Sequence, residues 1–114
     1  MAGTKYPVIL TSHMQEAIQG GAWIEVECVE APEKGGNTHR GGWTVFVCSD
    51  DGQGGVHRSV YVTNRDLKPR VFKTAAGLMS FCLELGAKVF SCPLREGERG
   101  TWEFETTRYP SSTG

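Results

Sequence analysis

The feature that most constrains this fold is a series of short segments in which apolar and polar residues alternate. Residues 22–29 alternate in this way, and residues 56–63 alternate again. A period of two indicates a β-strand with one buried face. Between them, residues 43–48 are almost continuously apolar, which is typical of a central strand covered on both faces. A glycine-rich turn at 49–55 joins the second and third segments, so the pattern predicts an antiparallel hairpin within a larger sheet.

Two other segments have helical patterns. Ser12 and Gln15 match a capping box, and the short helix that they begin is expected to end at Gly20. Thr74 can cap a longer helix that ends before Gly86. Four apolar residues of this longer helix share one face at i, i+3, i+4 and i+7: Leu78, Phe81, Cys82 and Leu85.

Further short strands are expected at 70–72, 88–94 and 101–107. Together these elements predict the α+β class: an antiparallel sheet of about five to six strands, with one main helix packed on one face and a short N-terminal helix. The expected core comprises Ile24, Val26, Val45, Val47, Val60, Val62, Leu78, Phe81, Leu85, Val89 and Phe90.

A chain of 114 residues can enclose one hydrophobic core, so we expect a single domain over 1–114. Within it, 1–10 and 108–114 are expected to be frayed ends, and the polar, proline- and glycine-containing stretch 31–42 a long loop. No apolar run approaches the length that spans a bilayer, so no membrane contact is expected. Because the first residues have no basic stretch followed by an apolar one, they do not resemble a secretory signal, and the expected location is the cytoplasm.

The four cysteines are expected to be free thiols, since each lies within an apolar run and none forms a C-x-x-C pair. That spacing also argues against a zinc site, so no metal or other cofactor is expected. No nucleophile motif, phosphate-binding loop or metalloprotease motif is present, and we therefore expect no enzymatic activity and no catalytic residue.

The net charge is −1, but basic residues gather in one part of the chain. Five cations lie between positions 58 and 73, next to two aromatic residues on the expected sheet. Cations beside accessible aromatic rings are what single-stranded nucleic acid needs, because the cations neutralise phosphates and the rings stack on bases. The candidate nucleic-acid-binding residues are Arg58, Tyr61, Arg65, Lys68, Arg70, Lys73 and Trp43. In the alternative interpretation, the two aromatic residues pack in the core.

A protein partner is the alternative function. Trp23 and Trp102 lie on acidic strands, and tryptophan is favoured at the centre of protein interfaces. The sheet also has edges, and edge pairing between two copies would form a homodimer. This alternative predicts a protein-interaction module or a homodimeric regulator or inhibitor.

The segment 70–90 resembles part of small accessory proteins of bacterial plasmids and integrative elements. The shared features are the entry Arg70-Val-Phe-Lys-Thr74, an apolar helix, a Leu-Gly stop at Gly86 and a following strand. The resemblance covers about a fifth of the chain and transfers no catalytic residue. It implies a bacterial cytoplasmic protein involved in the maintenance, replication or transfer of mobile DNA.

Overall fold

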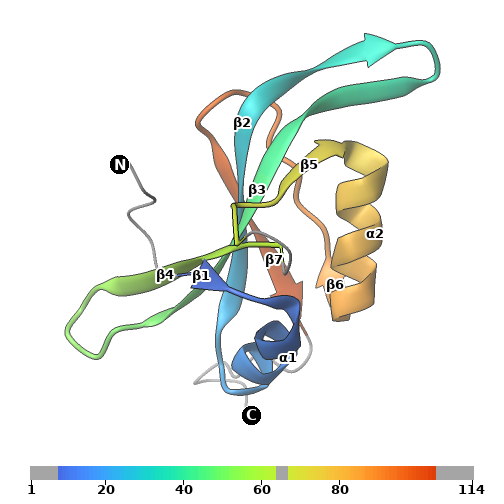
Figure 1. Ribbon diagram of the computed structural model, residues 1–114. Coiled ribbons are helices and arrows are strands. Elements are labelled where there is room, and N and C mark those ends of the chain that lie inside the picture. Colours follow the sequence, from blue (N-terminus) through green and yellow to red (C-terminus); the bar gives the residue numbers. More distant parts are fainter. Residues whose placement is uncertain (1–7, 64–66, 105–114) are drawn as a thin grey trace.

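The computed structural model describes residues 8–63 and 67–104, which form one twisted sheet with two helices (Figure 1). The elements are β1 (Val8–Ile9), α1 (Thr11–Gln19), β2 (Trp23–Gly35), β3 (Thr38–Asp50), β4 (Val56–Tyr61), β5 (Val71–Thr74), α2 (Ala75–Leu85), β6 (Ala87–Val89) and β7 (Arg99–Phe104). The strand order is β1-β4-β3-β2-β7-β6, and β5 pairs with β3. Every pairing of these strands is antiparallel except that of β1 with β4. The α+β class, the main helix and the short N-terminal helix are thus confirmed.

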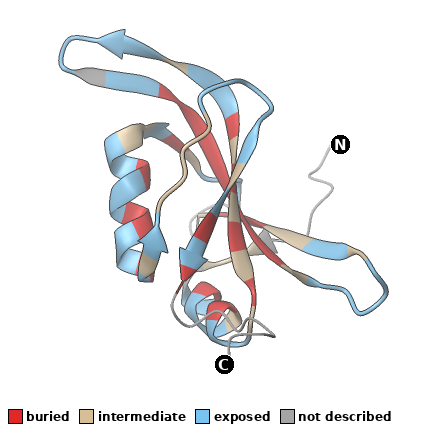
Figure 2. Cartoon of the chain, turned by 180° about the vertical axis from the view of Figure 1, so that it is seen from behind, coloured by how far each residue is buried: buried red, intermediate tan, exposed pale blue. Residues whose placement is uncertain are grey.

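Both helices cover the same face of the sheet. Met14 and Ile18 of α1 belong to the same buried cluster as the apolar stripe of α2, together with Trp43 and Trp102. Thr74 caps α2 as predicted, because its side chain accepts a hydrogen bond from the amide of Gly77 at 3.0 Å. Figure 2 shows the buried residues along the strands and on the inward side of each helix.

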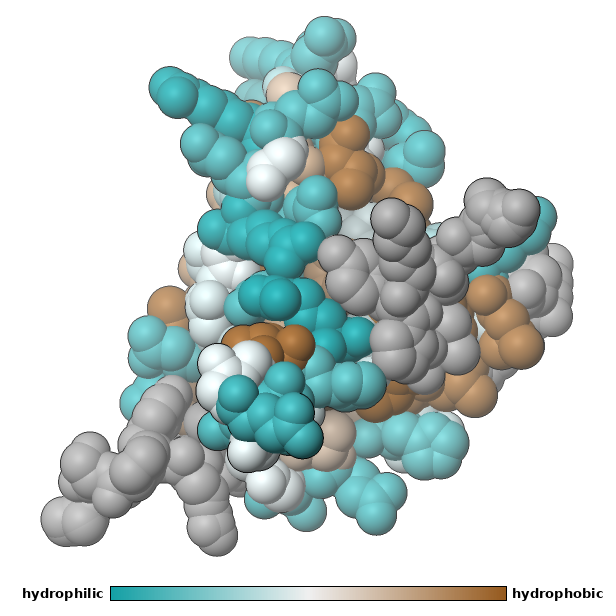
Figure 3. Space-filling model, turned by 90° about the vertical axis from the view of Figure 1, so that its left-hand side faces the viewer, coloured by the Kyte–Doolittle hydropathy of each residue, from teal (hydrophilic) through white to brown (hydrophobic). Residues whose placement is uncertain are grey.

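The opposite face of the sheet carries a second, smaller cluster. Phe46 and Cys48 of β3 pack there against Val60 and Val62. Residues 43–48 are therefore buried on both faces, as their apolar run predicted. Seen from the side away from α2, the molecular surface is mainly hydrophilic (Figure 3).

Three predictions about local structure are wrong. Residues 31–42 are a long hairpin of β2 and β3 instead of a loop; Pro32 is tolerated because this part of β2 has no second strand partner among the described residues. The helix α1 begins at Thr11 without a side-chain cap, so Ser12 forms no capping box. In the expected frayed end 1–10, β1 pairs with β4, whereas 1–7 and 108–114 lie outside the described residues.

The predicted core is mostly confirmed, with one error at β6. Val89 is 42% exposed because β6 is a three-residue edge strand with a register shift, and Phe90 is half-buried. No helix among the described residues is long and apolar enough to cross a membrane.

Candidate functional site

Two of the predicted basic residues, Lys68 and Arg70, lie where β4 connects to β5. The amide of Arg70 donates to the carbonyl of Tyr61 at 3.0 Å, and the amide of Thr63 donates to the carbonyl of Lys68 at 3.1 Å. These bonds hold the two ends of the connection together, so Lys68 and Arg70 are fixed beside the sheet and remain exposed. Arg65 lies outside the described residues.

Lys73 is exposed on β5, but on the other face of the strand from Arg70. The guanidinium of Arg70 lies 4.5 Å from the centre of the Phe72 ring, which faces α2. Because side chains alternate along a strand, Lys73 points to the opposite side from Phe72. The two cations can therefore contact one extended ligand along the edge of the sheet, but they do not converge on one point.

The register of β3 and β5 adds a cation that sequence reasoning missed. Arg40 is the partner of Thr74 in the β3–β5 pairing, one position along the strand from Lys73, and it is exposed. We use the term basic edge for the four exposed cations Arg40, Lys68, Arg70 and Lys73. Arg40 lies in the segment that was expected to be a loop. Its place beside β5 could be predicted only if the β2–β3 hairpin had been recognised.

Arg58 does not belong to the basic edge, contrary to the prediction. Its Nε donates to Oε1 of Glu25 at 3.1 Å, on the face of the sheet away from the helices. Arg99 Nη1 lies 3.6 Å from the same oxygen, and Arg99 also pairs with Glu27 at 3.3 Å. Two arginines and two glutamates therefore balance each other's charge.

Glu25 is the centre of this network, and only 14% of its side chain is exposed. Burial opposes its ionisation, but hydrogen bonds from Arg58 and from the Trp23 indole, with the charges of Arg58 and Arg99, outweigh burial and lower the pKa of Glu25. Half-buried Trp23 is thus occupied by a hydrogen bond of 3.3 Å to Glu25.

The aromatic residues predicted to stack on bases are in the core. Trp43 is 0% exposed, and its indole donates to the carbonyl of Pro93 at 2.8 Å. Tyr61 is 8% exposed and stacks on Phe81 with ring centres 4.9 Å apart. The alternative interpretation, core packing, is correct for both: Tyr61 packs against α2, and the segment that follows β6 accepts the indole hydrogen bond of Trp43.

The tryptophan-based protein interface is also wrong at Trp102. This residue is 1% exposed, and its indole donates to the carbonyl of Ser91 at 2.8 Å. It therefore packs inside the domain beneath α2 and cannot be an interface anchor.

A shallow hollow of about 280 Å³ lies beside Arg70. Its walls include Phe72 and Phe81, and Ser80 and Glu84 of α2 border it. The hollow brings one cation and one carboxylate together beside aromatic rings. Glu84 therefore offsets part of the positive charge of Arg70 on this side of the strand.

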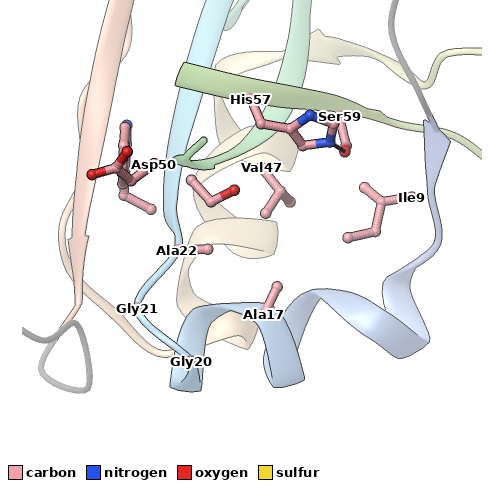
Figure 4. Close-up of a pocket in the computed structure, with 11 residues that line it drawn as sticks. Ile9, Ala17, Gly20, Gly21, Ala22, Val47, Asp50, His57 and Ser59 are labelled. Carbon is pink, nitrogen blue, oxygen red and sulfur yellow. Dashed lines mark hydrogen bonds between the residues drawn. The ribbon is translucent and has the colours of Figure 1, made fainter. Parts of the chain in front are cut away.

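The best candidate for nucleophilic chemistry lies in another hollow, of about 470 Å³, between α1 and the β3–β4 hairpin (Figure 4). Ser59 Oγ is 3.5 Å from Nε2 of His57, longer than a working nucleophile–base hydrogen bond. Asp50 lies across the hollow from this pair and accepts a bond from the amide of Gly52 at 2.8 Å, so it does not orient the imidazole. The amides of Gly20 and Gly21 donate to carbonyls of α1, which leaves neither to stabilise an oxyanion.

The cysteines form no disulfide, and Cys28, Cys48 and Cys82 are buried. Burial raises the pKa of Cys48 to about 12 and that of Cys82 to about 11. Burial also raises the pKa of Cys28 and Cys92. Such thiols make poor nucleophiles. Within 8–63 and 67–104, no group of three or more His, Cys, Asp or Glu side chains could hold a metal ion.

Comparison with known proteins gives no relative: no family model, no curated protein and no solved structure matches the chain.

Proposed function

We propose that this chain is a non-enzymatic nucleic-acid-binding protein that acts through the basic edge, in the cytoplasm of a bacterium that carries a mobile element. The observation that carries the proposal is the placement of four exposed cations, Arg40, Lys68, Arg70 and Lys73, along β5 and its partner strand. The mobile-element context is supported by the resemblance of segment 70–90, which includes β5 and α2.

The arrangement suits phosphate contact better than base stacking. Among the aromatic rings predicted to stack, Trp43 and Tyr61 are buried, so affinity must come from charge. Each phosphate contact adds about 0.9 to the slope of log affinity against log salt on duplex DNA, or about eightfold in affinity near 0.1 M salt. Four contacts would therefore give strongly salt-dependent binding despite a net charge of −1.

The test is a titration of labelled single-stranded and duplex DNA at low and moderate salt. Replacing Lys68, Arg70 and Lys73 by Gln should reduce the salt slope on duplex DNA by about 2.7. Arg58 is left unchanged, because its loss would remove the nearer of the two arginines paired with Glu25. Lys73→Gln and Lys88→Gln form a matched pair: each removes one exposed cation, from β5 or from β6, and only the first should reduce the slope. If neither form of DNA binds at low salt, the proposal is wrong.

A protein partner remains the second candidate, on a different surface from the one first predicted. Met79 and Leu83 are four residues apart on α2 and are 46% and 66% exposed. Exposed apolar residues on one helix face suit association with a second copy or another protein. Light scattering over a range of concentrations would detect a homodimer, and Leu83→Glu should then shift it to monomer. A monomer mass at every concentration would refute the homodimer.

A further inference from the structure

The β2–β3 hairpin extends beyond the sheet as a two-stranded arm, residues 33–40. It projects past α2 in Figure 1. β7 pairs with β2 only from Ile24 to Glu27, and β5 reaches β3 only as far as Arg40. Beyond these points the described strands of the arm pair only with each other, up to Gly35 opposite Thr38.

Irregular strand pairing at the base of the arm sets the direction in which the arm projects. Register shifts occur in β2 between Cys28 and Glu33, and in the β3–β5 pairing between Arg40 and Trp43. A Cβ atom at Gly41 would lie 2.7 Å from the carbonyl oxygen of Glu30, so no side chain fits there. β-Bulges bend and twist a strand pair, and here they determine the direction of the arm.

The chemistry of the arm tip, residues 34–40, indicates what it contacts. The tip contains Lys34, Asn37, His39 and Arg40, all exposed, and it has no large apolar side chain. The exposed residue before it, Glu33, is the cross-strand partner of Arg40. Protein interfaces depend on buried aromatic or aliphatic anchors, which the tip lacks. Arginine, lysine and asparagine are the side chains that bind base edges in the DNA major groove.

The dimensions of the arm fit the same partner. Three residues of β2, from Glu33 to Gly35, reach about 10 Å at about 3.4 Å per residue. The major groove is about 12 Å wide and about 8.5 Å deep, and it admits a two-stranded β-ribbon. Arg40 and Lys73 lie together where the arm leaves the sheet, where the phosphates that border the groove would be.

We propose that the arm enters the major groove of duplex DNA while the basic edge contacts the flanking phosphates. This inference rests on the proposed function and adds to it the form of nucleic acid and the groove. Lys34 stands opposite His39 on one face of the arm, and Arg40 stands opposite Glu33 on the other. The first face thus presents Lys34 to the groove, whereas on the second face Glu33 offsets the charge of Arg40.

The test compares two duplexes of about 30 base pairs, roughly three helical turns, of the same mixed sequence. One contains ordinary cytosine and the other glucosylated 5-hydroxymethylcytosine, which fills the major groove without changing the phosphate charge. Fluorescence anisotropy near 0.1 M salt should show about tenfold weaker binding to the glucosylated duplex, the scale of losing a base-edge contact. The variant Lys34→Gln, which leaves the basic edge intact, should bind both duplexes equally.

The matched control is Lys68→Gln, which removes the same charge from the basic edge. It should weaken both duplexes by a similar factor and keep the preference for the unmodified one. Asn37→Ala is a second, uncharged arm variant that should reduce the preference, and circular dichroism verifies that all variants fold.

Equal binding of the unchanged protein to the two duplexes, or binding to single strands only, would refute the arm inference while the proposed function stands. A preference that survives both arm variants would also refute it. Absence of binding to any DNA at low salt would overturn both proposals.

Discussion

Removing the Phe81 ring should cost a large part of the stability of the domain. Phe81 is 8% exposed on α2, and its ring centre lies 4.9 Å from that of Tyr61, 5.0 Å from that of Phe72 and 6.4 Å from that of Trp102. Phe81→Ala loses the burial of the ring and leaves a cavity between α2, β4 and β5, which costs about 3–5 kcal/mol. A domain of this size has a free energy of unfolding of about 5–15 kcal/mol, so the variant should lose a large fraction of its stability.

The measurement is urea unfolding at 25 °C followed by tryptophan fluorescence. For a slope of about 2 kcal/mol per molar urea, a loss of about 4 kcal/mol lowers the midpoint by about 2 M. Leu83→Ala is the matched control, because Leu83 is on the same helix but is 66% exposed. Its free energy of unfolding should change by less than about 0.5 kcal/mol. A loss below about 1 kcal/mol for Phe81→Ala would show that the packing of α2 on the sheet is not the main source of stability.

Three further predictions concern the helix cap, the buried ion network and the thiols. Thr74→Ala removes the acceptor for the amide of Gly77 and should cost about 0.5–2 kcal/mol in the same urea assay, whereas Thr74→Ser should cost much less. The pKa of Glu25 is lowered in the folded state from its ordinary 4.5, so its pairing stabilises the fold above that pH and is lost as pH falls through the lowered value. Glu25→Gln should therefore flatten the dependence of the unfolding midpoint on pH below 4.5. If the variant keeps the same pH dependence there, the ion pairs of Glu25 do not stabilise the fold. With a pKa of about 12, about one Cys48 thiol in 10⁴ is ionised at pH 8, so iodoacetamide should label it only after unfolding in urea, as mass spectrometry would detect.

The candidate site was only partly predictable. Lys68, Arg70 and Lys73 are exposed on and beside β5, as expected from a polar connection that leads into a capped helix. Arg58 followed the alternation of its strand correctly, but its hydrogen bond to Glu25 depends on a strand that lies more than thirty residues away in the chain. Arg40 was missed for the same reason, since its neighbour Lys73 belongs to a different strand.

The sequence by itself determined the elements whose signal is local. The period of two in 22–29 and 56–63, the continuous apolar run of 43–48, the Thr74 cap and the apolar stripe of α2 are each set by neighbours within a few residues. Local sterics and hydrogen bonding act on that scale, so these elements can be derived without the fold. Only the tertiary structure decided which residues meet across the sheet, because strand register depends on contacts between distant segments. Register places Gly41 against Glu30 and so turns a glycine-rich segment, which locally favours a loop, into a directed two-stranded arm.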